Sequence, residues 1–355
     1  MLERLALDDV HRAQGAAMEE RWGVVLPARY GDVVAEHRAV SEHVGVIDRS
    51  FVGKVTVTGR DRQAFLQGML SNEIKSLLPG QGTSAAFLDA HGKVMSLLHV
   101  SVLDDRLLIE LPPGSTAKTL QLLDKFLISE KAYFEAADDS FVVLAVEGPS
   151  APALLASLAG RDLPLGPNQH VEVSIAGAAV RVIHRSETGA SGFQCWTMPF
   201  HGAALWRALV EAGATPVGVQ ALDILRTEAG IPWYGQDVDE TVILPETRLE
   251  HVVSYNKGCY IGQEVVARVK YRGHVNRALS GLVLEGDRVP AAGATVLVEG
   301  QEIGRVTSAV RSIALGKPIA LGYVRREHFA PGTGVTVQDG DTPIPAHVAG
   351  LPFSP

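Results

Sequence analysis

Cysteine is nearly absent from this chain, which has only Cys195 and Cys259 in 355 residues. Two cysteines cannot form a disulfide framework, so a reducing compartment is expected, and we assign the cytoplasm. No run of 18 apolar residues occurs, and the first 20 residues carry acids and bases throughout. We therefore expect neither a membrane span nor a secretory signal.

Positive charge is also scarce, because 32 Lys and Arg residues face 40 Asp and Glu residues, for a formal net charge of −8. This balance argues against a general nucleic-acid-binding protein, which is usually basic. Several chemical motifs are missing as well, namely a G-x-G-x-x-G after a strand, a P-loop, H-E-x-x-H and C-x-x-C. The 12 histidines show no metal-ligand spacing, so no metal site is predicted.

What is present is a globular composition, with 46% hydrophobic and 20% charged residues. The length predicts two or three domains. Helices are predicted at residues 2–22, 33–44, 61–70, 115–128, 149–159, 201–212 and 217–229, and strands at 51–58, 93–103, 106–111, 141–147, 171–175, 179–184 and 192–198. From about residue 278 only short strands cut by Gly and Pro occur, which is typical of a separate all-β module. The sequence therefore predicts an α+β fold followed by a small β-barrel.

The most informative stretch is K-G-C-Y-I-G-Q-E at residues 257–264. Glycines on both sides leave the thiol of Cys259 without large flanking neighbours. Lys257 favours the thiolate, which is the reactive form. The alternative is a small cysteine packed as a hydrophobic residue. We assign that second role to Cys195, which stands beside Trp196 in a predicted strand.

A basic run, R-V-K-Y-R-G-H-V-N-R, follows at residues 268–277. Its period of two predicts a strand with Arg268, Lys270, Arg272 and His274 on one face. No acid occurs between Glu264 and Glu285. Such a strip suits an anionic ligand such as a phosphate or a polycarboxylate tail. The alternative is a solvated strand face, or one paired with acids elsewhere.

A third candidate is the run from Arg226 to Asp237. A helix is expected to stop at Gly230, because Pro232 prevents its continuation. Trp233 and Tyr234 then lie in a tight loop, one turn after Arg226. Flat rings beside a guanidinium can hold a planar heterocycle that carries a carboxylate. Ordinary aromatic packing at a helix end is the alternative.

Taken together, these runs resemble a known family. The segment from residue 257 to residue 277 resembles the hallmark of the YgfZ proteins, which are folate-binding relatives of the glycine-cleavage T-protein (aminomethyltransferase). The runs G-V-I-D-R-S at 45–50, D-A-H-G-K at 89–93, T-E-A-G-I-P at 227–232 and A-L-G-Y-V at 320–324 are similar to the same fold family. The resemblance covers nearly the whole chain.

The resemblance implies a three-domain, aminomethyltransferase-like folate-binding fold. Residues 1–277 would form two interleaved subdomains, roughly 1–50 with 140–230 and 51–139 with 231–277, and residues 278–355 the barrel. It implies tetrahydrofolate, or a polyglutamylated derivative, as the cofactor. It also implies a role in assembly or repair of iron–sulfur clusters in client enzymes, including radical enzymes that modify tRNA. Separately, we expect a monomer.

The family pattern also implies roles for individual residues. Cys259 would be the functional thiol, with Lys257 beside it. Arg226 stands where the T-protein has an arginine near its folate, and Tyr234 would place a ring beside the ligand. The positive strip would let Lys270 and Arg272 receive a polyglutamate tail.

Two departures from the T-protein pattern bear on activity. Met95 and Ser96 occupy the place of an Asp-Asp pair that contains the catalytic acid, so Ser96 would face the folate without a carboxylate. Gln194 stands in place of a pterin-binding Glu, and an amide cannot pair as an anion. Glycine-cleavage activity is therefore not expected. A folate-dependent one-carbon transferase is the alternative function, and direct tRNA binding is not expected.

Overall fold

The computed structural model describes residues 3–353. The chain folds into two compact units. The first contains the residues up to Ala85 together with Leu97–Leu222, and the second contains Ala86–Ser96 together with the residues from Asp223 onward. The second unit is therefore built from two segments that are far apart in the sequence.

The N-terminal region corrects one prediction, because residues 3–22 do not form a single helix. They contain β1 (Glu3–Arg4), α1 (Asp8–Ala13) and β2 (Ala17–Arg21), and β2 pairs antiparallel with β3 (Val24–Arg29). Residue 2 lies outside the described residues. Trp22 and Gly23 both have positive φ, as a two-residue hairpin turn requires. This turn, and Gly15 with φ of 78°, break the amphipathic pattern.

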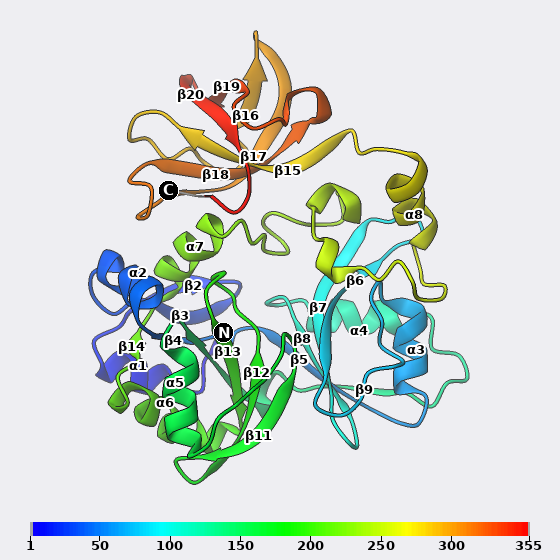
Figure 1. Cartoon of the computed structure of the whole chain (residues 1–355), viewed down its shortest axis with the longest axis vertical. Coiled ribbons are helices and arrows are strands. Elements are labelled where there is room, and N and C mark those ends of the chain that lie inside the picture. The colour runs from blue at the N-terminus through cyan, green and yellow to red at the C-terminus, as the bar shows by residue number, and fades with distance from the viewer. Residues whose placement is uncertain (1–2, 354–355) are drawn as a thin grey trace. The chain divides into compact units, whose positions relative to one another are not determined.

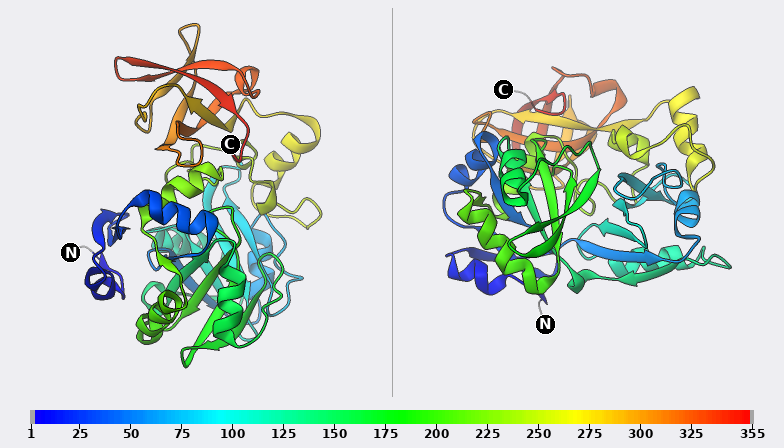
Figure 2. Two further views of the ribbon diagram at one scale, coloured as in Figure 1. Left: turned by 60° about the vertical axis from the view of Figure 1, so that its left-hand side comes forward. Right: turned by 60° about the horizontal axis from the view of Figure 1, so that its bottom comes forward.

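The main sheet of the first unit has six strands. Their order is β11 (His170–Ile175), β12 (Ala178–His184), β13 (Gly192–Thr197), β10 (Val142–Glu147), β4 (Gly45–Asp48) and β14 (Thr215–Pro216). Helices α5 (Ala151–Ala159) and α6 (Pro199–Glu211) pack against it (Figures 1 and 2). Every residue of β10 and β13 is buried, as in a strand covered on both faces.

Cys195 lies in β13 within this core and is fully buried, which confirms its predicted role. Burial raises the pKa of its thiol to about 12.

A second sheet has five strands, in the order β6 (Gly82–Leu88), β7 (Val94–Val102), β8 (Leu107–Leu111), β5 (Gly53–Thr58) and β9 (Tyr133–Ala136). The other helices up to residue 228 are α2 (Val33–Glu42), α3 (Arg62–Met69), α4 (Thr116–Asp124), the 3-10 turn η1 (Asp138–Ser140) and α7 (Val219–Glu228). These bounds agree with the predicted elements from residue 33 onward to within a few residues at most ends.

The C-terminal part is a closed six-stranded barrel, as predicted (Figure 1). Its order is β15 (Arg277–Leu284), β18 (Pro318–Arg325), β17 (Gln301–Arg311), β16 (Thr295–Val298), β19 (Gly334–Asp339) and β20 (Thr342–Ala349). Alternate side chains, such as Leu282, Leu284, Val335 and Val337, fill its interior. The α+β class with a C-terminal barrel is therefore confirmed.

The basic run after the cysteine motif is a helix, which corrects the predicted strand. Helix α8 spans Gln263–Arg272, and the 3-10 turns η2 (Leu244–Thr247) and η3 (Glu250–Val252) precede it, while η4 (Arg326–His328) follows β18. Val266 is the buried residue of α8, and Gly273 ends it. Lys270 and Arg272 lie about 200° apart around the helix axis, so the predicted one-sided strip does not form.

Among the described residues, no helix combines the length and the apolar character needed to cross a membrane.

Candidate functional site

A tyrosine in the second unit holds a carboxylate beside strand β7. The hydroxyl of Tyr234 is 2.5 Å from the carbonyl oxygen of Met95 and 3.0 Å from Oε1 of Glu240. A hydroxyl has one hydrogen, so it donates to one of these oxygens at a time. Burial, with the nearby charge of Asp239, raises the pKa of Tyr234 to about 12. The phenol therefore stays protonated at neutral pH and remains a donor.

Backbone pairing explains why this loop lies beside Met95. The amide of Val94 donates to the carbonyl of Val242, and the amide of Leu244 donates to the carbonyl of Gly92. These bonds join the start of β7 to the segment after Glu240. Within β7, Met95 is half-buried and Ser96 is fully buried, because successive strand residues point to opposite faces.

Arg226 is fully buried and saturated by protein partners. Its Nε donates to Asp223 (2.8 Å), its Nη1 to Asp237 (2.5 Å) and its Nη2 to Ser308 of β17 (2.7 Å). Its guanidinium also stacks 4.6 Å from the ring centroid of Trp233. Arg226 would reach a ligand only by giving up one of these partners.

Asp237 completes the turn around Tyr234. Its Oδ2 accepts from the amide of Trp233 (3.0 Å), and its Oδ1 accepts from the hydroxyls of Thr307 and Ser308. Asp237 is 2% exposed, so this carboxylate holds the loop and is not available to solvent. The loop that carries Tyr234 and Glu240 is thus anchored at both ends.

The cysteine motif is organised differently from its sequence interpretation. Cys259 is exposed, and its thiol is free of any disulfide. Lys257 is buried, and its ammonium group lies 5.2 Å from the ring centroid of Tyr260. Gly262 has φ of 80°, and a Cβ there would lie 2.6 Å from the carbonyl oxygen of Asp89. The motif glycine is therefore required by close packing. A functional role for Cys259 and Lys257 stays a prediction.

Lys270 and Arg272, the two residues of α8 expected to bind the tail, have separate surroundings. Lys270 donates to Glu250 (3.0 Å) and lies 4.8 Å from the ring centroid of Tyr255, whereas Arg272 is exposed in the last turn. The contact of Lys270 and Arg272 with a polyglutamate tail stays a prediction. The common strand face on which this prediction was based does not form.

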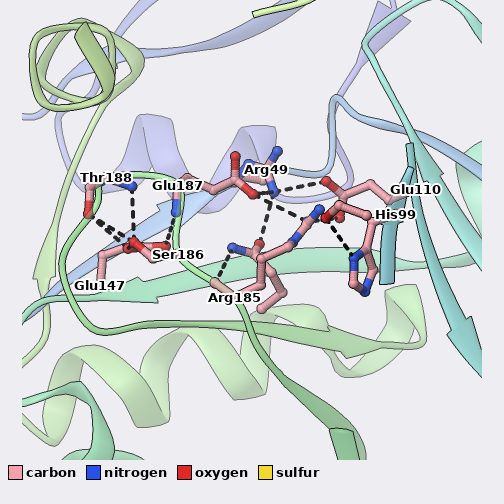
Figure 3. A network of polar contacts seen from close by, with 10 residues as sticks. Arg49, His99, Glu110, Glu147, Arg185, Ser186, Glu187 and Thr188 are labelled. Carbon is pink, nitrogen blue, oxygen red and sulfur yellow. Dashed lines mark hydrogen bonds and ion pairs between the residues drawn. The ribbon is translucent and has the colours of Figure 1, made fainter. Parts of the chain in front are cut away.

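Gln194 lies in the first unit and contacts a buried ionic network. Figure 3 shows the charged residues of this network, Arg49, Arg185, Glu110 and Glu187. Its Oε1 accepts from Arg49 (3.0 Å), and its Nε2 donates to the carbonyl of Arg185 (3.3 Å). Arg49 and Arg185 each pair with both Glu110 and Glu187, at 2.5–3.3 Å. Burial alone would raise the pKa of Glu110, but the attraction of Arg185 and Arg49 is stronger and holds this pKa below the usual range. Both ends of the Gln194 amide are occupied, so its contact with folate also stays a prediction.

No group of three or more His, Cys, Asp or Glu side chains suited to a metal ion occurs between residues 3 and 353.

Two family models cover almost the entire chain. The GCVT N-terminal domain matches residues 7–257, and the glycine cleavage T-protein C-terminal barrel domain matches residues 277–354. The chain belongs to the glycine-cleavage T-protein family.

Curated relatives and a solved structure agree with this T-protein assignment. An aminomethyltransferase from Streptomyces coelicolor is 36% identical over 99% of this chain and 97% of the relative. One from Thermosynechococcus vestitus is 32% identical over 99% and 95%. The crystal structure of the glycine cleavage system aminomethyltransferase T from Bartonella henselae has a TM-score of 0.91 at 26% identity, covering 100% of this chain and 98% of that one. The aminomethyltransferase-like fold is therefore confirmed.

These comparisons correct the finer assignment made from the cysteine motif. The relatives are named aminomethyltransferase, so the YgfZ assignment, the iron–sulfur role and the tRNA-modification clients were wrong. In this chain the motif at 257–264 packs the start of α8 against the turn at Asp89. Gly262 reflects that packing, whereas Gly258 meets no atom within 4 Å. A sequence pattern alone does not distinguish a glycine required by packing from one that leaves a thiol accessible.

Glu240 was not among the predicted site residues. It lies outside the strand that contains Met95 and Ser96, and its proximity to Met95 is visible only in the structure. The available signal was the run D-V-D-E at 237–240, which places three carboxylates within four residues directly after Tyr234.

Proposed function

We propose that this T-protein family member is a folate-dependent one-carbon transferase of the aminomethyltransferase kind. The observation that carries the proposal is the carboxylate of Glu240, which Tyr234 holds beside Met95. Met95 occupies the position where the family pattern has an acid. A neighbouring loop thus supplies the missing carboxylate.

The residue types around Glu240 suit a pterin. A half-exposed carboxylate can accept from ring N–H groups, and the aromatic ring of Tyr234 offers a flat apolar surface. Tetrahydrofolate would supply two nucleophilic nitrogens as the carbon acceptor. A folate contact of Ser96, the neighbour of Met95 in β7, belongs to this proposal as well, whereas we place Arg226 as a residue that positions the loop.

In the proposed reaction one carbon moves from a carrier thiol to folate, and every bond and proton is accounted for. The carbon of an aminomethyl group on a carrier thiol loses its bonds to sulfur and to the amine nitrogen, and it forms two bonds to folate nitrogens. The two folate N–H protons end on the thiol and on the released ammonia. Glu240 would take a proton from the folate nitrogen, and Tyr234 would hold the carboxylate in place.

The reverse reaction provides the test, with methylenetetrahydrofolate, ammonia and a small dithiol as substrates and mass spectrometry of the folate as the readout. We expect turnover by the wild type. Glu240→Gln should lower kcat by about 10²–10⁴-fold, as for a general base. Its Kd for tetrahydrofolate, measured by calorimetry, should change little.

Glu285→Gln is the matched control, because Glu285 is an exposed carboxylate in the barrel unit and should leave kcat unchanged. Absence of turnover in a wild type that binds tetrahydrofolate would contradict the transferase proposal. A Glu240→Gln variant with full kcat would remove Glu240 from the chemistry.

A further inference from the structure

A cavity of about 690 Å³ lies in the second unit, and nothing described so far uses it. Its walls are the loop 236–242 and strands β15, β17 and β18 of the barrel. The volume falls within the range of small-molecule sites, roughly 300–1,000 Å³. We call it the barrel-face cavity.

Three arginines line the barrel-face cavity: Arg277, Arg305 and Arg325. Arg277 lies directly opposite Arg325 across β15 and β18, and Arg305 lies opposite Tyr323, two residues before Arg325. Like charges placed opposite each other on neighbouring strands destabilise a sheet. The pairing of the strands alone therefore does not favour two arginines at these opposed positions.

Protein partners neutralise only part of this charge. Arg277 donates to Glu246 (3.2 Å) and to the carbonyl of Thr241 (3.0 Å). Within residues 3–353, by contrast, the side chains of Arg305 and Arg325 are exposed and form no hydrogen bond or ion pair.

Three carboxylates also line the cavity, but among the described residues none of them pairs with Arg305 or Arg325. Asp237 is committed to Arg226 and to hydroxyls of β17. Asp239 accepts from the amide and the hydroxyl of Thr241. Glu302 is the remaining acid in the wall.

Tyr323 adds an independent sign of a missing partner. Its side chain lines the cavity, is only 6% exposed, and carries a hydroxyl with no hydrogen-bond partner among the described residues. The guanidinium of Arg277 lies 5.2 Å from the centroid of its ring. Burial raises the pKa of Tyr323, so the hydroxyl is a permanent donor. A buried donor without an acceptor is unfavourable unless a ligand supplies one.

We propose that the barrel-face cavity binds a small molecule that carries a carboxylate or phosphate group. Oxygens of that group would accept from the Tyr323 hydroxyl and from the guanidinium groups of Arg305 and Arg325, which suit planar or bidentate oxyanion recognition. Neither Tyr234 nor Glu240 lines the cavity, and the site does not depend on the proposed transferase activity.

Calorimetric titration of the full chain with inorganic phosphate and with citrate, at one ionic strength set with chloride, tests the site and separates the two oxyanion classes. Saturable binding of at least one probe by the wild type is expected. Arg305→Gln and Arg325→Gln should each weaken that binding by about 10–100-fold, as for charge-assisted hydrogen bonds. Arg326→Gln is the matched control, because Arg326 is the next residue, is exposed and lies outside the cavity wall, so it should bind like the wild type.

Tyr323→Phe supplies a readout that a structural role would not give. It removes only the hydroxyl, so the melting temperature of the free protein should stay equal or rise, while probe affinity falls about tenfold. Absence of saturable binding of both probes by the wild type would overturn the site. Equal losses of probe affinity in Arg325→Gln and Arg326→Gln would show that diffuse surface charge, and not the proposed site, binds the probe. A lower melting temperature of Tyr323→Phe with unchanged probe affinity would show that the hydroxyl stabilises the fold and does not bind the ligand.

Discussion

At the scale of single residues, Glu147 is unusual because it is buried and forms no ion pair among the described residues. It is fully buried at the end of β10, and its oxygens accept from the hydroxyls of Ser186 and Thr188 and from the amide of Glu187 (Figure 3). Burial outweighs these bonds and raises the pKa of Glu147 to about 7. The pairs formed by Glu110 in the same unit lower its pKa, so two buried glutamates respond to pH in opposite directions.

Because the pKa of Glu147 is raised in the folded state, we expect the free energy of unfolding to fall as pH rises. Its folded pKa lies above its unfolded value, so the folded state holds the proton more tightly. This contribution is complete below the unfolded pKa and is lost as pH rises through about 7. Raising the pH from about 5 to about 8 should cost about 2–3 kcal/mol of unfolding free energy.

Urea denaturation of the wild type and Glu147→Gln at both pH values measures this effect. Glutamine cannot titrate and keeps the shape, so the difference between the two proteins isolates Glu147 from Glu110, which changes charge only at more acidic pH. Parallel pH dependence in both proteins would show that Glu147 is ionised throughout.

At the scale of an element, the N-terminus of α8 depends on one glycine. Gly262 combines φ of 80° with backbone contact to Asp89, so a side chain there meets both strain and a clash. Gly262→Ala should lower the unfolding free energy by about 2–4 kcal/mol. Gly258→Ala, four residues earlier in the same motif, meets nothing within 4 Å and should change it little.

Denaturation midpoints of the two variants decide the point. Equal and small effects would mean that α8 does not pack on the turn at Asp89 in solution. A large effect in both would instead indicate that the entire motif is closely packed.

The elements that the sequence predicts well are those whose own residues form a core. Strands β10 and β13 are buried at every residue, and side chains of the barrel strands fill the barrel interior. The strand predicted at 268–277 was wrong, because a short alternating run also fits a helix with one buried residue, here Val266. The helix predicted at 2–22 failed because a hairpin turn at Trp22 carries little sequence signal.

The site was harder to predict for a related reason. The sequence singles out Arg226 and Tyr234 because they are close in the chain, and their contact with a ligand stays a prediction. Glu240 becomes relevant only through Tyr234, whose hydroxyl also contacts the carbonyl of Met95. A pattern cannot show that residues so far apart in the chain share one hydroxyl. The same limit hid the barrel-face cavity, whose arginines come from three strands.

At the scale of the whole molecule, Arg226 joins α7, the loop at Asp237 and strand β17 of the barrel through buried charge-assisted bonds. Arg226→Met would leave Asp237 buried without its cation. We expect the unfolding free energy to drop by about 3–5 kcal/mol, as for removal of one partner of a buried pair.

A double variant, Arg226→Met with Asp237→Asn, should recover part of this loss, because no unpaired charge then remains. The same proteins should be titrated with tetrahydrofolate. Unchanged stability together with weaker folate binding would show that Arg226 contacts the ligand instead of holding the loop.

The two-segment make-up of the second unit also sets an order in time. The amide of Val94 and the carbonyl of Gly92 find their partners only in residues 242–244. The ribosome synthesises residues 97–222 before it reaches these partners. In a nascent chain these backbone groups therefore still lack their hydrogen-bond partners when the first unit is complete and able to fold. The start of β7 is thus an open strand end during synthesis, and it is the place where a stalled or truncated chain would most readily pair with another copy.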